Sequence, residues 1–230
     1  MGLPIPPDEF DQLREQGIEL VCLPEYFFIP SSIRSQQETL SLRSAILSSL
    51  KDYSLRLGGT VVGGSLVEEE DGELFAASHV FDRGRHIGFY RKMHPTDHER
   101  RVGIRPGNQP VVLEIRGLRL GLLVCADVLF PESVYALASL QPDLIAIPTA
   151  SPYRPNDTVE EKFLRDREIF LAAARITRGI ILKTCGVGSL MGEKLQGRSL
   201  ICDSRGFLAR VAPNKEDEEA ILTASCPSSG

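Results

Sequence analysis

Residues 111–131 read VVLEIRGLRLGLLVCADVLFP, and this stretch is the most informative about the fold. A turn at Arg116-Gly117 separates two apolar runs. The second run, Leu118 to Val124, is apolar enough to form a strand that is covered on both faces. Cys125 follows directly, so we expect its thiol at the end of a buried strand, where a loop or a helix opens.

Downstream, the pattern alternates between helices and strands. A helix that starts with proline is predicted over 131–140, and a buried strand over 144–147. Thr158 and Glu161 form a possible capping box for a long helix that stops near Gly179. Further strands are predicted at Ile180 to Thr184, Ser199 to Cys202 and Phe207 to Val211, with a possible addition at Ile221 to Ala224.

Upstream, a short apolar run over 19–23 predicts a buried strand that delivers Glu25 at its C-terminal end. Helical spacing predicts an amphipathic helix over 42–57. An antiparallel meander follows and runs directly into Lys92 and a polar loop over 93–108; its predicted strands are Thr60 to Val67, Leu74 to Phe81 and His86 to Tyr90. The mixture of βα units and hairpins predicts an α/β or α+β layered fold, with residues 1–230 as a single domain.

Composition narrows the classes of function. The 230 residues carry a net charge of -5 without a Lys/Arg cluster, so a small-molecule partner is expected and nucleic acid is not. No apolar run is long enough for a membrane span, and no signal sequence is recognised. Five widely spaced cysteines favour reduced thiols in a cytoplasmic protein and no metal site; they are Cys22, Cys125, Cys185, Cys202 and Cys226.

Glu25, Lys92 and Cys125 each follow a predicted strand and open a loop. In a layered fold such positions can converge at one edge, where the carboxylate would take the thiol proton and the ammonium would favour the thiolate and then an oxyanion. Each residue also has an ordinary structural interpretation. Cys125 could be a core residue, Glu25 a solvated strand end, and Lys92 a surface charge.

Three strings around these residues resemble the nitrilase superfamily of carbon-nitrogen hydrolases, in the right chain order. They are LVCLPEYF at 20–27, FYRKMHPTDHE at 89–99 and GLLVCADVLFPE at 121–132. Further similar segments are RPG at 105–107, PDLIAIPTA at 142–150 and GRSLICDSRGFLARV at 197–211, so the resemblance covers roughly 19–211.

The resemblance implies an αββα sandwich with mixed sheets and a Glu-Lys-Cys triad. Glu25 would be the general base, Lys92 the oxyanion stabiliser and Cys125 the nucleophile that attacks an amide, carbamoyl or nitrile carbon. Glu99, seven residues after Lys92, would be a second glutamate that orients the lysine or the substrate; alternatively, it is a loop charge paired with Arg100 or Arg101.

Three further residues complete the expected site. The backbone N–H of Ala126 would donate to the oxyanion. Tyr26 and His94 would line the substrate pocket, although Tyr26 is equally plausible in the core, and a Cys-His hydrolase would use a histidine of this loop as its base. The resemblance also suggests a homodimer or higher homo-oligomer. No cofactor or metal is expected, because side chains, backbone donors and water complete the chemistry.

The chain also departs from the family pattern. Ala126 stands where Trp or Tyr is common, so a bulky wall is removed. Both ends look shortened, and the loss of a central strand would leave backbone groups unpaired at ~1–3 kcal/mol each. We therefore expect a hydrolase of a small amide or carbamoyl compound. The alternatives are a nitrilase that converts a nitrile to acid and ammonia, and a silent member that acts as a binding or assembly subunit.

Overall fold

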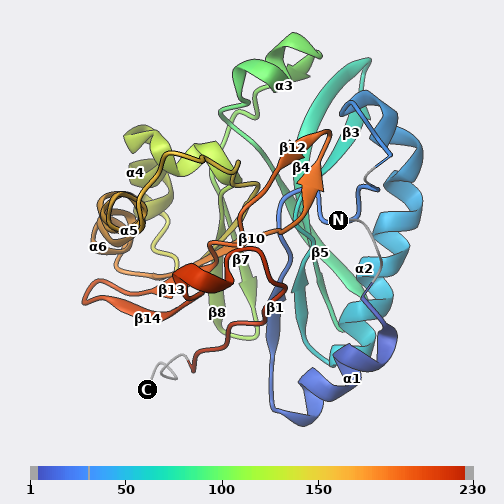
Figure 1. Cartoon of the computed structure of the whole chain (residues 1–230). Coiled ribbons are helices and arrows are strands. Elements are labelled where there is room, and N and C mark those ends of the chain that lie inside the picture. The colour runs from blue at the N-terminus through green and yellow to red at the C-terminus, as the bar shows by residue number, and fades with distance from the viewer. Residues whose placement is uncertain (1–4, 31, 226–230) are drawn as a thin grey trace.

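The computed structural model describes residues 5–30 and 32–225, which form two mixed sheets stacked face to face with helices outside them (Figure 1). This is the αββα sandwich expected from the sequence. The first sheet contains β1 (Leu20–Cys22), β2 (Thr60–Val62), β3 (Leu66–Glu70), β4 (Glu73–Asp82), β5 (Arg85–Arg91) and β6 (Ile104–Arg105). The second runs in the order β14 (Phe207–Arg210), β13 (Leu200–Cys202), β10 (Ile180–Cys185), β9 (Leu144–Thr149), β8 (Leu118–Leu122) and β7 (Val111–Ile115).

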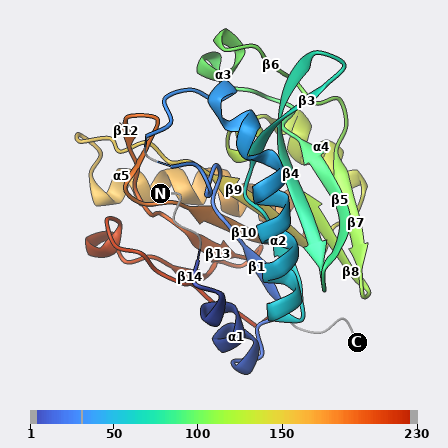
Figure 2. The same cartoon turned by 90° about the vertical axis from the view of Figure 1, so that its right-hand side faces the viewer.

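Helices cover the outer face of each sheet. On the first sheet lie α1 (Pro7–Glu15) and α2 (Arg43–Leu57), and Figure 2 shows α2 lying across its strands. On the second lie α4 (Pro131–Ser139), α5 (Val159–Asp166) and α6 (Ala172–Thr177). Shorter pieces are α3 (Asp97–Arg101), the 3-10 turns η1 (Gln37–Leu42), η2 (Cys125–Leu129) and η4 (Pro213–Lys215), and the hairpin β11 (Ser189–Leu190) and β12 (Glu193–Lys194).

The core is divided by the first sheet. Neighbouring residues of one strand point to opposite faces, so Val62 joins the core between the two sheets, whereas Val61 joins the core under α1 and α2. Phe10 and Tyr53 stack in the second of these cores, with ring centroids 4.3 Å apart. Burial on both faces explains why β9 and the second half of β8 are apolar, whereas Arg119 near the start of β8 is exposed.

Several predicted elements need correction. The strand predicted over Thr60–Val67 is split into β2 and β3 by Gly63, Gly64 and Ser65. The polar loop over 93–108 contains α3 and β6, because Thr96 caps a helical turn there. The possible strand over Ile221–Ala224 is irregular chain that pairs with no described strand.

Two further differences concern helix and strand continuity. The long helix after Thr158 starts with the predicted capping box, but the π-helical segment η3 (Arg167–Leu171) separates α5 from α6. The strand predicted to end before Pro148 continues through it to Thr149. Pro148 lies beyond the end of β8, so its missing N–H leaves no ladder bond unmade on that side.

Three further observations concern membrane-spanning helices, the cysteines and the edge of the first sheet. None of the helices they form combines the length and apolar composition that crossing a bilayer demands. Cys22, Cys125, Cys185 and Cys202 are free thiols, and Cys226 lies outside the described residues. Strand β1 pairs with β2 along one edge, and no described strand pairs with its other edge.

Gly64 provides a test of how the break between β2 and β3 positions the chain after β1. Its φ is +69°, and an added Cβ would overlap the carbonyl oxygen of Pro24. Gly72 is the matched control, since its φ is +79° but an added Cβ would meet nothing within 4 Å. Gly72→Ala should therefore cost about 1–2 kcal/mol in the free energy of unfolding, for left-handed strain alone. Gly64→Ala should cost about 2–5 kcal/mol, because the overlap is added.

Urea unfolding of both variants measures this difference. Equal losses of stability in the two variants would show that the close approach of Pro24 carries no constraint.

Candidate active site

The three residues singled out by the sequence come together between the two sheets. Glu25 follows β1 and Lys92 follows β5, both in the first sheet, while Cys125 follows β8 in the second sheet. Figure 1 shows the strands of the two sheets facing each other, and the hydrogen bonds of Lys92 bring together residues that are far apart in the sequence. The predicted convergence of strand ends is therefore observed.

Lys92 lies between two carboxylates. Its Nζ donates to Glu25 Oε1 at 2.9 Å and to Glu99 Oε2 at 2.7 Å. All three side chains are buried, with Lys92 only 1% exposed. The alternative in which Glu99 pairs with a neighbouring arginine is not observed, because the first turn of α3 directs Glu99 inward.

Local structure explains the position of Glu99. Thr96 caps α3 by accepting from the backbone N of Glu99, and Glu99 Oε2 accepts from the backbone N of Thr96 at 2.8 Å. The same oxygen accepts from Lys92, so one carboxylate both closes the helix cap and holds the lysine.

Cys125 lies opposite this group and is tied to it by backbone and carboxylate contacts. The thiol donates to the carbonyl oxygen of Ala150 at 3.7 Å, and it lies close enough to Glu25 for the two groups to shift each other's pKa. The N–H of Ala150 donates to Glu25 Oε2 at 2.9 Å. Sequence reasoning did not select Ala150, although it ends the PDLIAIPTA string after β9. Cys125 itself has a φ of +49°, an uncommon value for a residue with a side chain.

The electrostatics favour a neutral thiol rather than a thiolate. Burial raises the pKa of Cys125 and the charge of Glu25 raises it further, and the opposing effect of Lys92 is smaller. Burial likewise raises the pKa of Glu25 despite the attraction of Lys92. The charge of Lys92 does lower the pKa of the thiol, which is the direction expected from the sequence, but burial and Glu25 together raise it by more.

The other two members of the cluster are held in their charged forms. Burial alone would lower the pKa of Lys92, but the charges of Glu25, Cys125 and Glu99 raise it above its ordinary value. Burial would raise the pKa of Glu99, but Lys92, the N–H of Thr96 and the hydroxyl of Tyr26 together lower it. The cluster thus contains a firmly protonated lysine, an ionised Glu99, and a Glu25 that accepts a proton more readily than an ordinary glutamate.

Tyr26 is placed differently from the expected pocket wall. It is 3% exposed and packs in the core under α1 and α2. Its hydroxyl donates to Glu99 Oε1 at 3.0 Å, so Tyr26 lies behind Glu99 and holds it. The φ of +53° at Tyr26 turns the chain away from the strand direction, and this turn could not be seen in the sequence pattern.

His94 lies two residues after Lys92 in the chain, and Ala126 directly follows Cys125. The ring of His94 stacks on Phe130, with centroids 3.8 Å apart and planes at 6°. Ala126 is partly exposed in the first turn of η2. Glu25 lies close enough to the thiol to raise its pKa, whereas the ring of His94 stacks on Phe130, so the carboxylate is the better candidate for a base.

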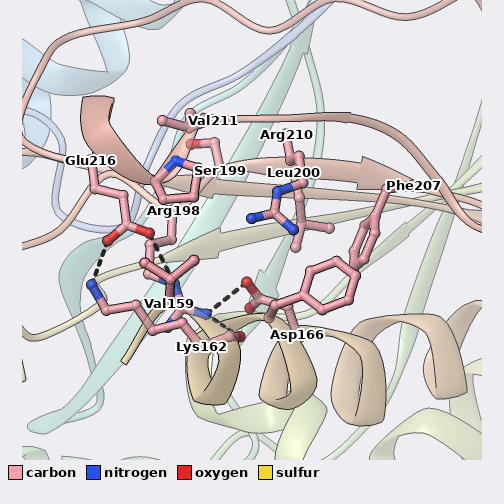
Figure 3. A pocket seen from close by; sticks show the side chains of 12 residues that line it. Val159, Lys162, Asp166, Arg198, Ser199, Leu200, Phe207, Arg210, Val211 and Glu216 are labelled. Atoms are coloured by element: carbon pink, nitrogen blue, oxygen red, sulfur yellow. Dashed lines mark hydrogen bonds and ion pairs between the residues drawn. The ribbon is translucent and has the colours of Figure 1, made fainter. Parts of the chain in front are cut away.

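A separate hollow between α5 and β13–β14 is filled by ion pairs (Figure 3). Lys162 meets Glu216 at 2.6 Å, and Arg198 meets Asp166 at 2.7 Å. The free volume is about 10 Å³, which is room for about one water molecule. The described residues contain no cluster of metal-ligating side chains either. This hollow therefore anchors the segment around Glu216 and does not compete with the site around Cys125.

Comparison with known proteins shows the same relationship over almost the whole chain. The model of the carbon-nitrogen hydrolase family matches residues 10–230. A nitrilase from Pyrococcus abyssi is 28% identical over 216 residues, covering 90% of this chain and 77% of the nitrilase. A glutamine-dependent NAD(+) synthetase from Thermotoga maritima is 26% identical over 219 residues, and the match covers 91% of this chain but 36% of the synthetase.

A solved structure agrees with these sequence matches. A variant of the amidase from Nesterenkonia sp. AN1 is 25% identical and superposes with a TM-score of 0.74, covering 89% of this chain and 80% of the amidase chain. In that structure acrylamide has added to the active-site cysteine. Since the family model, the relatives and the fold agree, the chain belongs to the carbon-nitrogen hydrolase family, within the nitrilase superfamily.

Proposed function

We propose that this carbon-nitrogen hydrolase cleaves a non-peptide C–N bond of a small amide or carbamoyl compound through a thioester on Cys125. The observation that carries the proposal is the buried arrangement of Glu25, Lys92 and Cys125. Glu25 lies close enough to the thiol for the two groups to shift each other's pKa, and the ammonium of Lys92 is held against the same carboxylate at 2.9 Å. This combination supplies a nucleophile, a proton acceptor and an electrostatic partner for an oxyanion.

In the proposed first half-reaction, Glu25 takes the thiol proton as sulfur attacks the carbonyl carbon. The C–S bond forms and the carbonyl electrons move onto oxygen, where the ammonium of Lys92 and the N–H of Ala126 stabilise the charge. The oxyanion then collapses and the C–N bond breaks. Glu25 returns its proton to the departing ammonia or amine, which leaves a thioester.

In the second half-reaction, Glu25 deprotonates water, which attacks the thioester carbon. The C–S bond breaks, the thiol regains its proton from Glu25, and the acid is released. Glu99 and Tyr26 keep Lys92 oriented through both steps. Glu99 acts by direct contact with Lys92, and Tyr26 acts through Glu99.

One alternative substrate class has specific support. The relative from Pyrococcus abyssi is a nitrilase, so turnover of a nitrile to acid and ammonia is the second candidate function. His94 and Ala126 remain proposed pocket residues, His94 because it follows Lys92 in the same loop and Ala126 because it directly follows Cys125. The cytoplasmic location and the homodimer or higher homo-oligomer expected from the sequence remain predictions.

Glu25→Gln retains the shape of the side chain but removes the base, so turnover should fall by about 10²–10⁴-fold.

Cys125 should form the covalent intermediate. Incubation with small reactive amides, followed by peptide mass mapping, should place an acyl adduct on Cys125 in the wild type. Cys185→Ser, which removes another buried thiol, is the control and should leave the adduct unchanged. An unmodified Cys125 across a broad panel of substrates would favour the silent binding or assembly subunit.

Ammonia release from matched pairs of substrates should separate the two enzymatic functions. We expect release from small carboxamides or carbamoyl compounds, with the nitriles of the same carbon skeleton turned over poorly. Turnover of nitriles to acid, with the amides untouched, would replace the amidase proposal by the nitrilase one.

The pH dependence of kcat/KM should reveal the base. Glu25 must be ionised to accept the thiol proton, so activity is present above its pKa and lost as pH falls through it. Because burial raises that pKa, the acid limb should lie above the value of ~4.3 for an ordinary glutamate. A limb at or below the ordinary value would remove Glu25 as the titrating group. Because the buried groups interact, the measured value belongs to the cluster as a whole.

A further inference from the structure

We propose that Asp127 is a positioning residue that fixes the lysine loop of the first sheet against the nucleophile turn of the second sheet. The lysine loop is defined here as residues 90–94 and the nucleophile turn as residues 124–127. This inference rests on the proposed function, because the two segments carry Lys92 and Cys125. Asp127 would act only through those residues.

On the nucleophile side, Asp127 closes the turn that contains Cys125. Its Oδ2 accepts from the backbone N of Val124 at 3.0 Å, and its own backbone N donates to the carbonyl oxygen of Val124 at 3.1 Å. These two bonds bracket Cys125, whose φ of +49° requires the surroundings to hold it. The side chain of Asp127 therefore helps to maintain the backbone conformation of the nucleophile.

On the lysine side, the same carboxylate holds both flanks of Lys92. The hydroxyl of Tyr90 donates to Asp127 Oδ2 at 2.7 Å, and the backbone N of His94 donates to Asp127 Oδ1 at 2.7 Å. The Tyr90 hydroxyl also accepts from the N of Met93 at 3.3 Å. Lys92 is thus enclosed by residues fixed to Asp127 before and after it in the chain.

The chemistry of these contacts requires an acceptor on both oxygens. Three donors converge on Asp127, and both Asp127 and Tyr90 are fully buried. An amide in this position would turn an N–H₂ group toward at least one N–H or O–H donor. Burial raises the pKa of Asp127 by more than its three hydrogen bonds and the charge of Lys92 lower it, and none of the ion pairs found among the described residues includes Asp127. Burying a carboxylate whose hydrogen bonds all come from neutral donors costs free energy, which indicates that Asp127 has a function that offsets this cost.

That use is the spacing between the sheets. Lys92, Glu25 and Glu99 belong to the first sheet or the loops that follow it, whereas Cys125 belongs to the second. A relative shift of about 1 Å between reacting groups can cost about 10²-fold in rate, so a direct link between the two segments matters for turnover. Asp127 makes this link with contacts to 124 on one side and to 90 and 94 on the other.

The test compares Asp127→Asn with Asp143→Asn. Asp143 is the matched control, because its Oδ2 also accepts from a backbone N–H, that of Arg119 at 2.8 Å, at the opposite end of β8 and β9. Asp127→Asn should lower kcat by about 10²-fold with KM within about threefold. It should also slow alkylation of Cys125 by iodoacetamide and change the pH profile of that alkylation. Asp143→Asn should leave kcat and the alkylation profile unchanged, even if both variants melt at lower temperature.

Tyr90→Phe provides a second variant that keeps the ring in the core and removes one donor. It should lower kcat by about tenfold, and adding it to Asp127→Asn should cause little further loss, because the hydroxyl acts through the same carboxylate. If Asp127→Asn folds with kcat and alkylation rates within threefold of the wild type, the proposal is overturned. If that variant does not fold, an unchanged kcat in Tyr90→Phe overturns it instead.

The same data separate this proposal from the proposed function. If the wild type turns over neither amides nor nitriles, the hydrolase proposal fails. The alkylation profiles of Cys125 in the two aspartate variants then still decide whether Asp127 controls the environment of the thiol.

Discussion

The ammonium group of Lys92 is held between the carboxylates of Glu25 and Glu99 in the interior of the protein, and the rest of the site is built around this contact. Burying three charges is costly, so each must be paired, and the loss of one partner would leave another charge without compensation. The pairing also fixes geometry, since Glu25 comes from the chain after β1 and Glu99 from α3. Charge pairing, together with apolar packing, therefore fixes how these segments lie relative to one another.

This pairing explains why the thiol is not activated at rest. With Lys92 committed to two carboxylates, its charge does not offset burial and the negative charge of Glu25 at Cys125, and the pKa of the thiol stays raised. In the proposed mechanism, proton transfer to Glu25 would be coupled to attack on a substrate, and the approach of a carbonyl group would create the charge that Lys92 stabilises.

The two sheets must also be held together at the site, and direct hydrogen bonds do this in two places. The Ala150 N–H donates to Glu25, and the carboxylate of Asp127 accepts from donors on both sides of the gap. Gly64 allows the chain before Glu25 to approach β2 and β3 closely, which side chains of ordinary size would prevent. Together these contacts hold groups from both sheets close to one another in a single site.

Most of the longer strands and helices, the positions of Glu25, Lys92 and Cys125 at strand ends, and the family resemblance could be predicted from the sequence alone. It could do so because apolar periodicity and turn residues act over a few neighbouring positions, as the capping box of Thr158 shows. Glu99 could also be predicted from the sequence, because it lies seven residues after Lys92 in the same short motif.

Only the tertiary structure showed the contacts between segments that are far apart in the chain. It moved Tyr26 from the expected pocket wall to a position behind Glu99, added Ala150, and showed that Asp127 spans both segments. It also set the balance of charges at Cys125, where burial and Glu25 raise the pKa of the thiol by more than Lys92 lowers it. The physical reason is that hydrogen bonding across the sheets and the balance of buried charges depend on how the layers pack, and local sequence pattern carries no record of those distances.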